Sequence, residues 1–312
     1  MTKTIPKISV VVPCYNSELF IKETIASILS NMSNEIQLEI IAINDCSTDR
    51  TIEILKGFGD VLKVIDKVIN EGACRARNDG IMAASGEFIA LCDHDDIWEP
   101  DKLIRQLEKF SDPYVGLVCS DADSFNEHGV LIASMATDRP LKRGMVFHQL
   151  LCTNFIIQSS AIIRKEVFEE AGLFNEQIFP AEDLDLWLRI TQKWHVNYVE
   201  KVLVHYRISS TMYSRDKIRM KQARIPVIIN YAKKMDSAKV GRKIISIALR
   251  EFGMDYWYDR QFIEARRKLK EAVKYDKKYG IIFYLLLTYL PPFALNTMLL
   301  LKQKLLNRAV CL

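Results

Sequence analysis

The chain has 312 residues, enough for one large domain with an appendage or for two domains. The net charge of +4 and the lack of a dense Lys/Arg stripe interleaved with aromatic residues argue against a nucleic-acid partner. Seven scattered cysteines without a CxxC pair favour a reducing compartment over a disulfide framework or a structural zinc site. Residues 1–7 are polar and lead directly into a predicted strand, so we expect no signal peptide and a cytoplasmic location.

Alternating strands and helices are predicted over the first 120 residues. The predicted strands are residues 8–13, 38–43, 62–69, 88–92 and 114–120, and the predicted helices are residues 18–29, 51–56, 73–84 and 101–110. Short apolar runs separated by amphipathic helices are typical of a mostly parallel sheet with helices on both faces. The sequence therefore predicts an α/β fold in this part of the chain.

Polar clusters follow four of the predicted strands. They are Pro13-Cys14-Tyr15-Asn16, Asn44-Asp45-Cys46-Ser47, Asn70-Glu71-Gly72 and Asp93-His94-Asp95-Asp96. In open α/β sheets, ligands bind outside the carboxyl ends of the strands. Because all four clusters fall at such ends, we expect them to share one binding site.

The last of these clusters places three carboxylates within residues 93–96, directly after an apolar run. Like charges this close repel, and each carboxylate costs free energy to desolvate. A divalent cation such as Mg²⁺ or Mn²⁺ prefers oxygen ligands and removes that cost. On spacing alone, a solvated acidic turn before the next helix is an equally good interpretation.

The rest of the chain is less regular and then helical. A strand is predicted over residues 154–164, and residues 180–187 enter a helix. Residues 248–274 are typical of two helices joined near Tyr258-Asp259. We predict a first domain over residues 1–214, a helical appendage over 215–280, and a C-terminal segment over 281–312.

Residues 281–301 are almost continuously apolar, and ~20 residues at ~1.5 Å each are long enough to span a bilayer. Pro291-Pro292 breaks this run, and basic residues flank it on both sides. Two short interfacial helices or a re-entrant hairpin fit better than a single span. We expect association with an anionic membrane surface; a buried core hairpin or a subunit contact is the alternative.

Five motifs occur in the order and spacing of family 2 glycosyltransferases. They are residues 8–16 (ISVVVPCYN), 44–50 (NDCSTDR), 70–86 (NEGACRARNDGIMAASG), 93–96 (DHDD) and 182–189 (EDLDLWLR). Over about residues 5–210 the chain resembles that family. The resemblance implies a Rossmann-like GT-A fold and an inverting transfer of a sugar from a nucleotide diphosphate to an acceptor hydroxyl, with Mg²⁺ or Mn²⁺ as cofactor.

The resemblance assigns the acidic cluster to the metal and the donor. It implies that Asp95 is the direct metal ligand, and that Asp93 holds the ribose and helps to hold the metal through water. It further implies that Asp96 supports the loop and that His94 points away from the ion.

The same resemblance implies a nucleotide-binding loop at Pro13, Tyr15 and Asn16, in which Tyr15 stacks on the base. Asp45 matches the position whose carboxylate accepts a hydrogen bond from the base, which favours uracil and hence a UDP-sugar donor. Its alternative is a helix N-terminal acid. Arg77 matches a nucleotide-contacting position.

Two alternatives stay open for Arg77, an ion pair with Asp79 or one with Glu71. Arg207 is expected to clamp phosphate oxygens, with a structural role as the alternative.

The Glu182-Asp183 pair matches the family's catalytic position. An inverting transfer needs one base and no protein nucleophile, and the resemblance implies that Asp183 is that base and that Glu182 orients the loop or the acceptor. The alternative is helix N-terminal charge. We expect a saccharide or lipid-linked saccharide acceptor, in bacterial cell-surface polysaccharide, lipopolysaccharide or capsule synthesis.

Three other protein classes were weighed against this interpretation. No GxGxxG follows the first strand and no GxxxxGK[ST] occurs, so a dinucleotide-binding or P-loop protein is disfavoured. The loop after the first strand has neither Gly nor Lys/Arg, which disfavours a nucleotidylyltransferase. A catalytically silent nucleotide-sugar-binding or membrane scaffold protein of the same fold remains the alternative.

Overall fold

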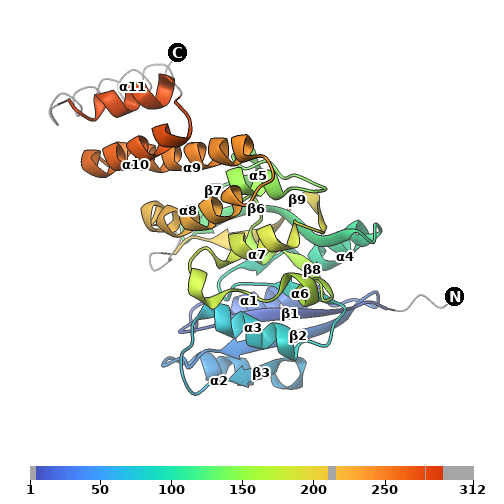
Figure 1. Ribbon diagram of the computed structural model, residues 1–312. Coiled ribbons are helices and arrows are strands. Elements are labelled where there is room, and N and C mark those ends of the chain that lie inside the picture. Colours follow the sequence, from blue (N-terminus) through green and yellow to red (C-terminus); the bar gives the residue numbers. More distant parts are fainter. Residues whose placement is uncertain (1–4, 210–215, 278, 291–312) are drawn as a thin grey trace, which may run out of the picture. The chain divides into compact units, whose positions relative to one another are not determined.

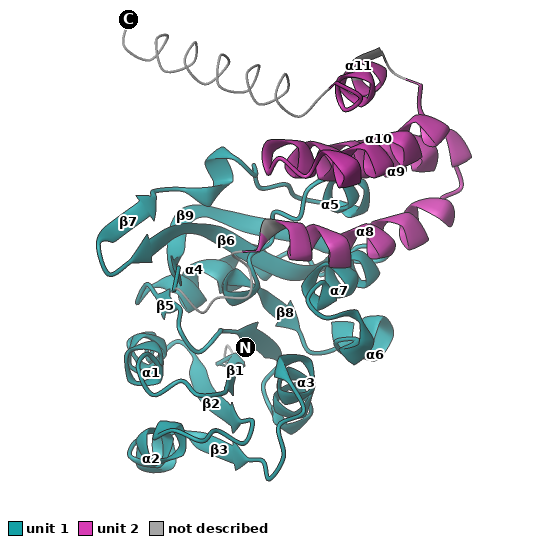
Figure 2. Cartoon of the chain, turned by 90° about the vertical axis from the view of Figure 1, so that its left-hand side faces the viewer, with its two compact units in different colours: residues 1–212 teal, residues 213–312 magenta. Residues whose placement is uncertain are grey.

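The computed structural model describes residues 5–209, 216–277 and 279–290 (Figure 1). The chain divides into two compact units, Met1–Met212 and Tyr213–Leu312 (Figure 2). The first unit contains a mixed sheet with helices around it, and the second unit is helical.

A nine-stranded sheet with the order β3-β2-β1-β4-β8-β6-β9-β5 forms the first unit, and β7 pairs with β6 outside this path. The strands are β1 (Lys7–Cys14), β2 (Gln37–Asn44), β3 (Lys63–Asp66), β4 (Phe88–Leu91), β5 (Ile97–Trp98), β6 (Val115–Asn126), β7 (Gly129–Ile132), β8 (Ile162–Arg164) and β9 (His195–Arg207). The α-helices are α1 (Ile21–Leu29), α2 (Thr51–Lys56), α3 (Ala73–Ala83), α4 (Lys102–Leu107), α5 (Phe147–Cys152), α6 (Val167–Ala171) and α7 (Glu182–Ile190).

The predicted α/β fold is confirmed, and its parallel character is strongest in the N-terminal half. Strands β3, β2, β1 and β4 are parallel neighbours. Strand β8 is antiparallel to both β4 and β6, and β5 and β7 are antiparallel to β9 and β6. The β6–β7 pair is a hairpin, which needs only a short turn, whereas parallel neighbours need a long crossover.

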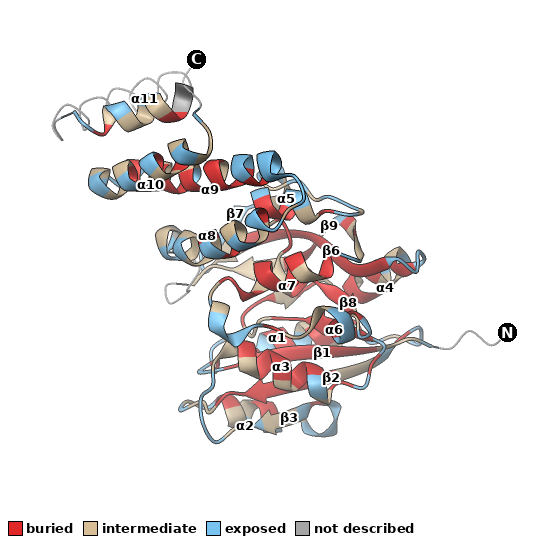
Figure 3. Cartoon of the chain, in the orientation of Figure 1, coloured by how far each residue is buried: buried red, intermediate tan, exposed pale blue. Residues whose placement is uncertain are grey.

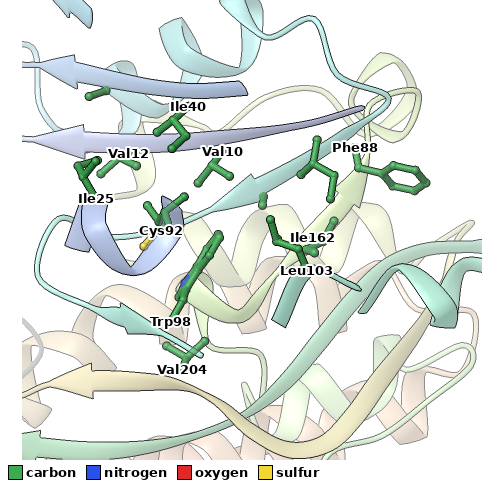
Figure 4. Close-up of a cluster of buried hydrophobic side chains, with 14 of the residues drawn as sticks. Val10, Val12, Ile25, Ile40, Phe88, Cys92, Trp98, Leu103, Ile162 and Val204 are labelled. Carbon is green, nitrogen blue, oxygen red and sulfur yellow. The ribbon is translucent and has the colours of Figure 1, made fainter. Parts of the chain in front are cut away.

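Helices cover both faces of the parallel part (Figure 2). Val10 of β1 belongs to the same buried cluster as Ile25 of α1 (Figure 4). Its neighbour Val11 points to the other face, against α3, because side chains alternate along a strand. A Cβ on Gly80 of α3 would lie 2.5 Å from Val11 Cγ1, so this close approach depends on glycine. Strands β1 and β4, between these layers, are buried, as Figure 3 shows for β1.

Strand β5 is only two residues long but is fixed by a buried tryptophan. Trp98 is 2% exposed and belongs to the buried cluster with Cys92 and Val204 (Figure 4). Its indole Nε1 donates to the Ser159 carbonyl at 3.0 Å. Because residues 93–96 lie between β4 and β5, this anchor limits the movement of the acidic cluster.

The predicted strand over residues 154–164 is wrong, because only Ile162–Arg164 is a strand. The preceding residues Gln158–Ser160 form a 3-10 turn. The Ser160 hydroxyl donates to the Ile157 carbonyl at 2.7 Å, and such local bonds compete with strand pairing. Strand β9 was not predicted at all, and β6 runs six residues past its predicted end at residue 120, to Asn126.

The second unit contains α8 (Lys217–Lys233), α9 (Ala238–Tyr258), α10 (Phe262–Tyr275) and α11 (Tyr279–Leu287). The predicted pair of helices joined near Tyr258-Asp259 is confirmed as α9 and α10. Within the described residues, no helix has both the length and the apolar character that crossing a bilayer requires. The predicted break at Pro291-Pro292 lies outside the described residues.

Candidate active site

A buried arginine joins two acidic segments of the first unit. Arg77 of α3 is 7% exposed; its Nη2 lies 2.7 Å from Asp93 Oδ1, and its Nη1 lies 3.2 Å from Glu182 Oε1. Burial opposes the arginine charge, but the two carboxylates outweigh it and raise the pKa of Arg77. Arg77 therefore brings the acidic cluster after β4 next to the first turn of α7.

The alternative ion pairs of Arg77 with Asp79 or Glu71 are not formed, because Lys67 contacts both acids and Arg75 contacts Asp79 as well. Its Nζ lies 3.2 Å from Asp79, 2.8 Å from Glu71 and 3.1 Å from Asp45. Lys67 thus lies among three carboxylates next to β3, Asp79 is also paired with Arg75 at 3.0 Å, and Arg77 is left to Asp93 and Glu182.

Asp45 is 2% exposed and holds the turn in front of α3. Its Oδ1 accepts from the Glu71 N–H at 3.1 Å, and its Oδ2 accepts from the Gly72 N–H at 2.7 Å. These contacts match the helix-end alternative for Asp45. Because Lys67 Nζ also lies 3.1 Å from Oδ1, only Oδ2 keeps a lone pair for a further donor.

The loops after β1 and β2 are tied together by Asn16. Its side-chain oxygen accepts from the Thr48 N–H at 2.8 Å, and its own N–H donates to the Ser47 hydroxyl at 3.0 Å. Asn16 adopts a left-handed conformation with φ of 48°. Tyr15, which follows Pro13 and Cys14 at the end of β1, is 47% exposed, so its ring is open to a ligand.

Two departures from the family pattern fit the local geometry. Cys46 stands where the family commonly has glycine, and it adopts a left-handed φ of 61°, which explains why glycine suits the position. Asn44 replaces a common aspartate, and its amide donates to Asp66 Oδ1 at 2.7 Å. The Asn44 amide can donate to Asp66, whereas an aspartate at position 44 would repel the Asp66 carboxylate.

Within the acidic cluster, Asp95 and Asp96 are buried at 9% and 0% exposure. Burial raises the pKa of Asp95, helped by the charge of Asp93 and opposed by His94. Burial also raises the pKa of Asp96 well above its usual value, with Asp95 adding to the effect. Asp96 Oδ1 accepts from the Arg207 N–H at 3.1 Å, so it supports the loop from inside.

Asp95 and Asp96 are the two carboxylates of the cluster without an ion-pair partner among the described residues, and Asp96 is held by the Arg207 N–H. The Asp95 carboxylate has less support. Among the described residues, no other side chain hydrogen-bonds to it or forms an ion pair with it, whereas Asp93 has Arg77. No group of three or more His, Cys, Asp and Glu side chains in the described ranges is placed to hold a metal ion. A Mg²⁺ site of one or two carboxylates plus substrate phosphates needs no such group. The residues present therefore fit a cation that a diphosphate helps to bind.

The Glu182-Asp183 pair begins α7. Glu182 is 5% exposed, and burial raises its pKa to about 7, against the pull of Arg77. Its Oε2 is buried without a hydrogen-bond partner among the described residues. Asp183 is less buried, and its Oδ2 accepts from the Asn154 amide at 2.8 Å. Asp183 is therefore the more accessible of the two carboxylates.

Arg207, at the end of β9, is held by the protein's own groups. Its Nε donates to the Asp95 carbonyl at 2.8 Å, and its Nη2 lies 2.6 Å from Glu23 Oε2. The guanidinium also stacks on the rings of Phe20 and Phe125. These contacts favour the structural alternative, in which Arg207 holds the acidic cluster.

Sequence reasoning missed three polar contacts of this region. Ser159 accepts from the Asp93 N–H at 2.9 Å, Asn154 binds Asp183, and Glu23 binds Arg207. All three lie in segments without a motif, and they reach their partners only through the fold. No sequence signal pointed to them.

The chain was compared with known proteins. The model of Glycosyl transferase family 2 matches residues 9–172, more than half of the chain. A putative teichuronic acid biosynthesis glycosyltransferase, TuaG of Bacillus subtilis, is 29% identical over 70% of this chain and 85% of its own length. A β-1,3-glucosyltransferase of Escherichia coli, WfgD, is 26% identical over 68% of this chain and 81% of its own. The chain also matches two uncharacterised rickettsial glycosyltransferases at 28% identity, and it spans about a third of their length.

Solved structures share the fold. Residues 1–349 of TarS from S. aureus, in complex with UDP-GlcNAc, have a TM-score of 0.64 at 18% identity and cover 86% of this chain and 81% of theirs. A mannosyltransferase of Pyrobaculum calidifontis, in complex with GDP-Man and Mn²⁺, has a TM-score of 0.62 at 19% identity. The match covers 94% of this chain and 84% of the mannosyltransferase chain. The family match and the shared fold agree with the motifs of the sequence: the chain belongs to glycosyl transferase family 2.

Proposed function

We propose that the protein is an inverting glycosyltransferase that moves a sugar from a UDP-sugar to an acceptor hydroxyl in bacterial cell-surface polysaccharide, lipopolysaccharide or capsule synthesis. The observation that carries the proposal is the Arg77 bridge, because it sets the acidic cluster beside the Glu182-Asp183 pair. Donor-side and acceptor-side chemistry must meet within a few ångströms for a single displacement. A catalytically silent nucleotide-sugar-binding scaffold is the alternative.

In this proposal Asp45 and the loop of Pro13, Tyr15 and Asn16 bind the base. Asp45 follows β2 and keeps a lone pair on Oδ2 after its two backbone bonds and its Lys67 contact, and the exposed Tyr15 ring follows the neighbouring strand β1. A carboxylate selects a ring with an N–H donor, which favours uracil. The binding of UDP-GlcNAc by TarS, which has the same fold, supports a UDP-sugar.

Asp95 holds Mg²⁺ or Mn²⁺, and Asp93, fixed by Arg77, lies beside it and binds the ribose. The bound cation supplies neutralising charge for the leaving diphosphate. Support comes from the uncompensated, buried Asp95 carboxylate and from the Mn²⁺ bound with GDP-Man in the mannosyltransferase of the same fold. Arg207 positions the loop through the Asp95 carbonyl, and we assign it no direct phosphate contact.

Asp183 accepts the proton of the acceptor hydroxyl, which then displaces the diphosphate from the opposite face of the sugar. The more exposed carboxylate suits this role, because a base must reach its substrate within hydrogen-bond distance. Asn154 fixes one oxygen of Asp183 and Arg77 fixes Glu182. The unpartnered Glu182 Oε2 is then available to orient the acceptor hydroxyl.

A lipid-linked acceptor and a peripheral location on the inner face of the membrane complete the proposal. WfgD, by its name, acts on an acceptor linked to diphosphoundecaprenol. In the second unit, four apolar side chains at helical spacing along and just after α11 are exposed, namely Phe283, Leu286, Tyr289 and Leu290. The Arg266 guanidinium lies 4.0 Å from the Tyr289 ring centre, and the Lys270 ammonium lies 5.5 Å from it. Apolar residues beside basic and aromatic ones suit an anionic bilayer surface.

The Asp183→Asn variant tests the base. We expect kcat to fall by roughly 10²–10⁴-fold, because an amide cannot accept the proton, while the Kd for UDP stays near the wild-type value. Release of nucleoside diphosphate and calorimetric titration with UDP measure the two quantities. Asp185→Asn, two residues further along α7, is the matched control and should lower stability through its Arg189 ion pair but keep transfer. Equal loss of binding and transfer in Asp183→Asn would show a structural role.

The Asp95→Asn variant tests the metal ligand, with two readouts that move in opposite directions. Its Mn²⁺-dependent UDP binding should weaken by roughly 10–100-fold. Because folding raises the pKa of Asp95, the buried charge costs stability at neutral pH, so the ligand-free variant should melt at a higher temperature than the wild type. A variant that melts lower and loses binding with and without Mn²⁺ alike would contradict the assignment.

The Phe283→Glu/Leu286→Glu double variant tests the membrane surface. The wild-type chain should sediment with phosphatidylglycerol vesicles and not with phosphatidylcholine vesicles, and the double variant should lose this binding because it places charges on the apolar face of α11. Ile263→Glu/Val240→Glu changes two exposed apolar residues elsewhere in the second unit and should keep it. Unchanged binding, or equal loss in both variants, would rule out this face.

A further inference from the structure

A histidine beside the acidic cluster is held between two carboxylates. His205 lies in β9, with Nδ1 2.9 Å from Asp123 Oδ2 and Nε2 3.0 Å from Glu99 Oε1. A neutral imidazole has one N–H donor and one acceptor nitrogen, so it can donate to only one of these acids. Both contacts are favourable only for the imidazolium, in which each ring nitrogen carries a proton.

The partners of His205 lie on different elements. Asp123 is its register partner in β6, and Glu99 follows the two-residue strand β5. These two carboxylates are the charged groups that face the ring from the packed elements, and the Phe125 ring meets it edge-on with centroids 6.4 Å apart. On its own strand, Arg207 is turned to the Asp95 carbonyl. The imidazolium therefore joins three segments of the sheet.

Glu99 lies three residues after the acidic cluster, so its contact bears on the loop. In the sheet, β5 pairs with β9 alone, through Ile97 with His205 and Trp98 with Val204. The Glu99 N–H donates to the Leu203 carbonyl at 3.1 Å. Strand β9 thus contacts the loop of residues 93–96 directly through Arg207, and contacts the segment that follows it through His205 and Glu99.

We infer that His205 is a positioning residue, whose imidazolium clamps Glu99 to Asp123 and so holds the loop of residues 93–96 in the geometry that binds the donor diphosphate. The clamp makes donor binding sensitive to pH. Without its second proton, the ring presents a lone pair to one carboxylate, and the end of β5 is released. This inference rests on the proposed function for its binding readout only.

The direction of the pH effect follows from the same contacts. Burial of the ring lowers the pKa of His205, but Asp123 and Glu99 outweigh it and raise the pKa above the ordinary value. The stabilisation is complete below the pKa of the unfolded chain, ~6.5, and is lost as the pH rises through the higher folded value. The clamp is therefore intact in mildly acidic solution and opens toward alkaline pH.

Glu99→Gln is the decisive variant, because a glutamine amide can donate to the unprotonated ring nitrogen and accept from the protonated one. We expect the Kd of the wild type for UDP with Mg²⁺, divided by that of Glu99→Gln, to rise roughly 5-fold or more between pH 6 and pH 8.5. The ratio at each pH cancels the titration of UDP and of Asp95, which both proteins share. The Kd of His205→Gln for UDP, divided by that of Glu99→Gln, should be the same at every pH.

His195→Gln is the matched control, since His195 lies at the other end of β9, 3.8 Å from Asp112 Oδ2. The Kd of His195→Gln for UDP should equal that of the wild type at every pH. Nuclear magnetic resonance titration of the histidine rings adds a readout that needs no nucleotide. The His205 signal, identified by its loss in His205→Gln, should titrate above ~6.5 in the wild type and lower in Glu99→Gln.

The outcomes separate this inference from the proposed function. An ordinary His205 pKa, or a constant ratio of wild-type to Glu99→Gln Kd, overturns the clamp and leaves the glycosyltransferase proposal intact. A raised His205 pKa in a protein that binds no UDP at any pH supports the clamp and overturns the proposed donor.

Discussion

The buried charge of Arg77 is the interaction on which the site depends. A guanidinium that is 7% exposed is costly unless its charge is compensated, and Asp93 and Glu182 supply that compensation from segments 89 residues apart. Removing either acid leaves the arginine with one partner in a desolvated place. The same contact that stabilises the first unit therefore fixes the distance between the acidic cluster and the start of α7.

The acidic cluster is the complementary feature, because there the compensation is incomplete. Asp93 has Arg77 and Asp96 has the Arg207 N–H, but Asp95 is buried without a cationic partner among the described side chains. Such a loop keeps its shape only if the surrounding structure holds it. Trp98 anchors the strand that follows, and β9 contacts the loop and the segment after it. The fold thus maintains an unfavourable charge at the place where a cation and a diphosphate would relieve it.

The sequence predicted the first half of the fold well, because its signals are local. Apolar runs predicted β1, β2 and β4, and α2 has the bounds predicted for it, residues 51–56. Strand β9 escaped prediction because its residues are buried by distant partners, and their pattern alone does not show it. The strand expected before Ile162 is not formed because the Ser160 hydroxyl bonds the local backbone.

For the site, motifs identified which residues matter but not what they contact. Arg77 was expected to contact nucleotide, with Asp79 or Glu71 as alternative partners, and the fold places Asp93 and Glu182 at its guanidinium. Arg207 was expected to clamp phosphate, with a structural role as the alternative, and its contacts with the Asp95 carbonyl and Glu23 favour the structural role. Long arginine side chains reach partners that only tertiary structure brings near, so their roles are the least predictable from sequence.

A donor screen tests the central claim most directly. The purified chain is incubated with UDP-, GDP- and dTDP-sugars, with Mn²⁺ or with a chelator, and released nucleoside diphosphate is measured. We expect release of UDP from at least one UDP-sugar, and loss of that release when the cation is removed. Tight binding of a nucleotide sugar without turnover of any donor, with or without metal, would contradict it and favour the silent scaffold.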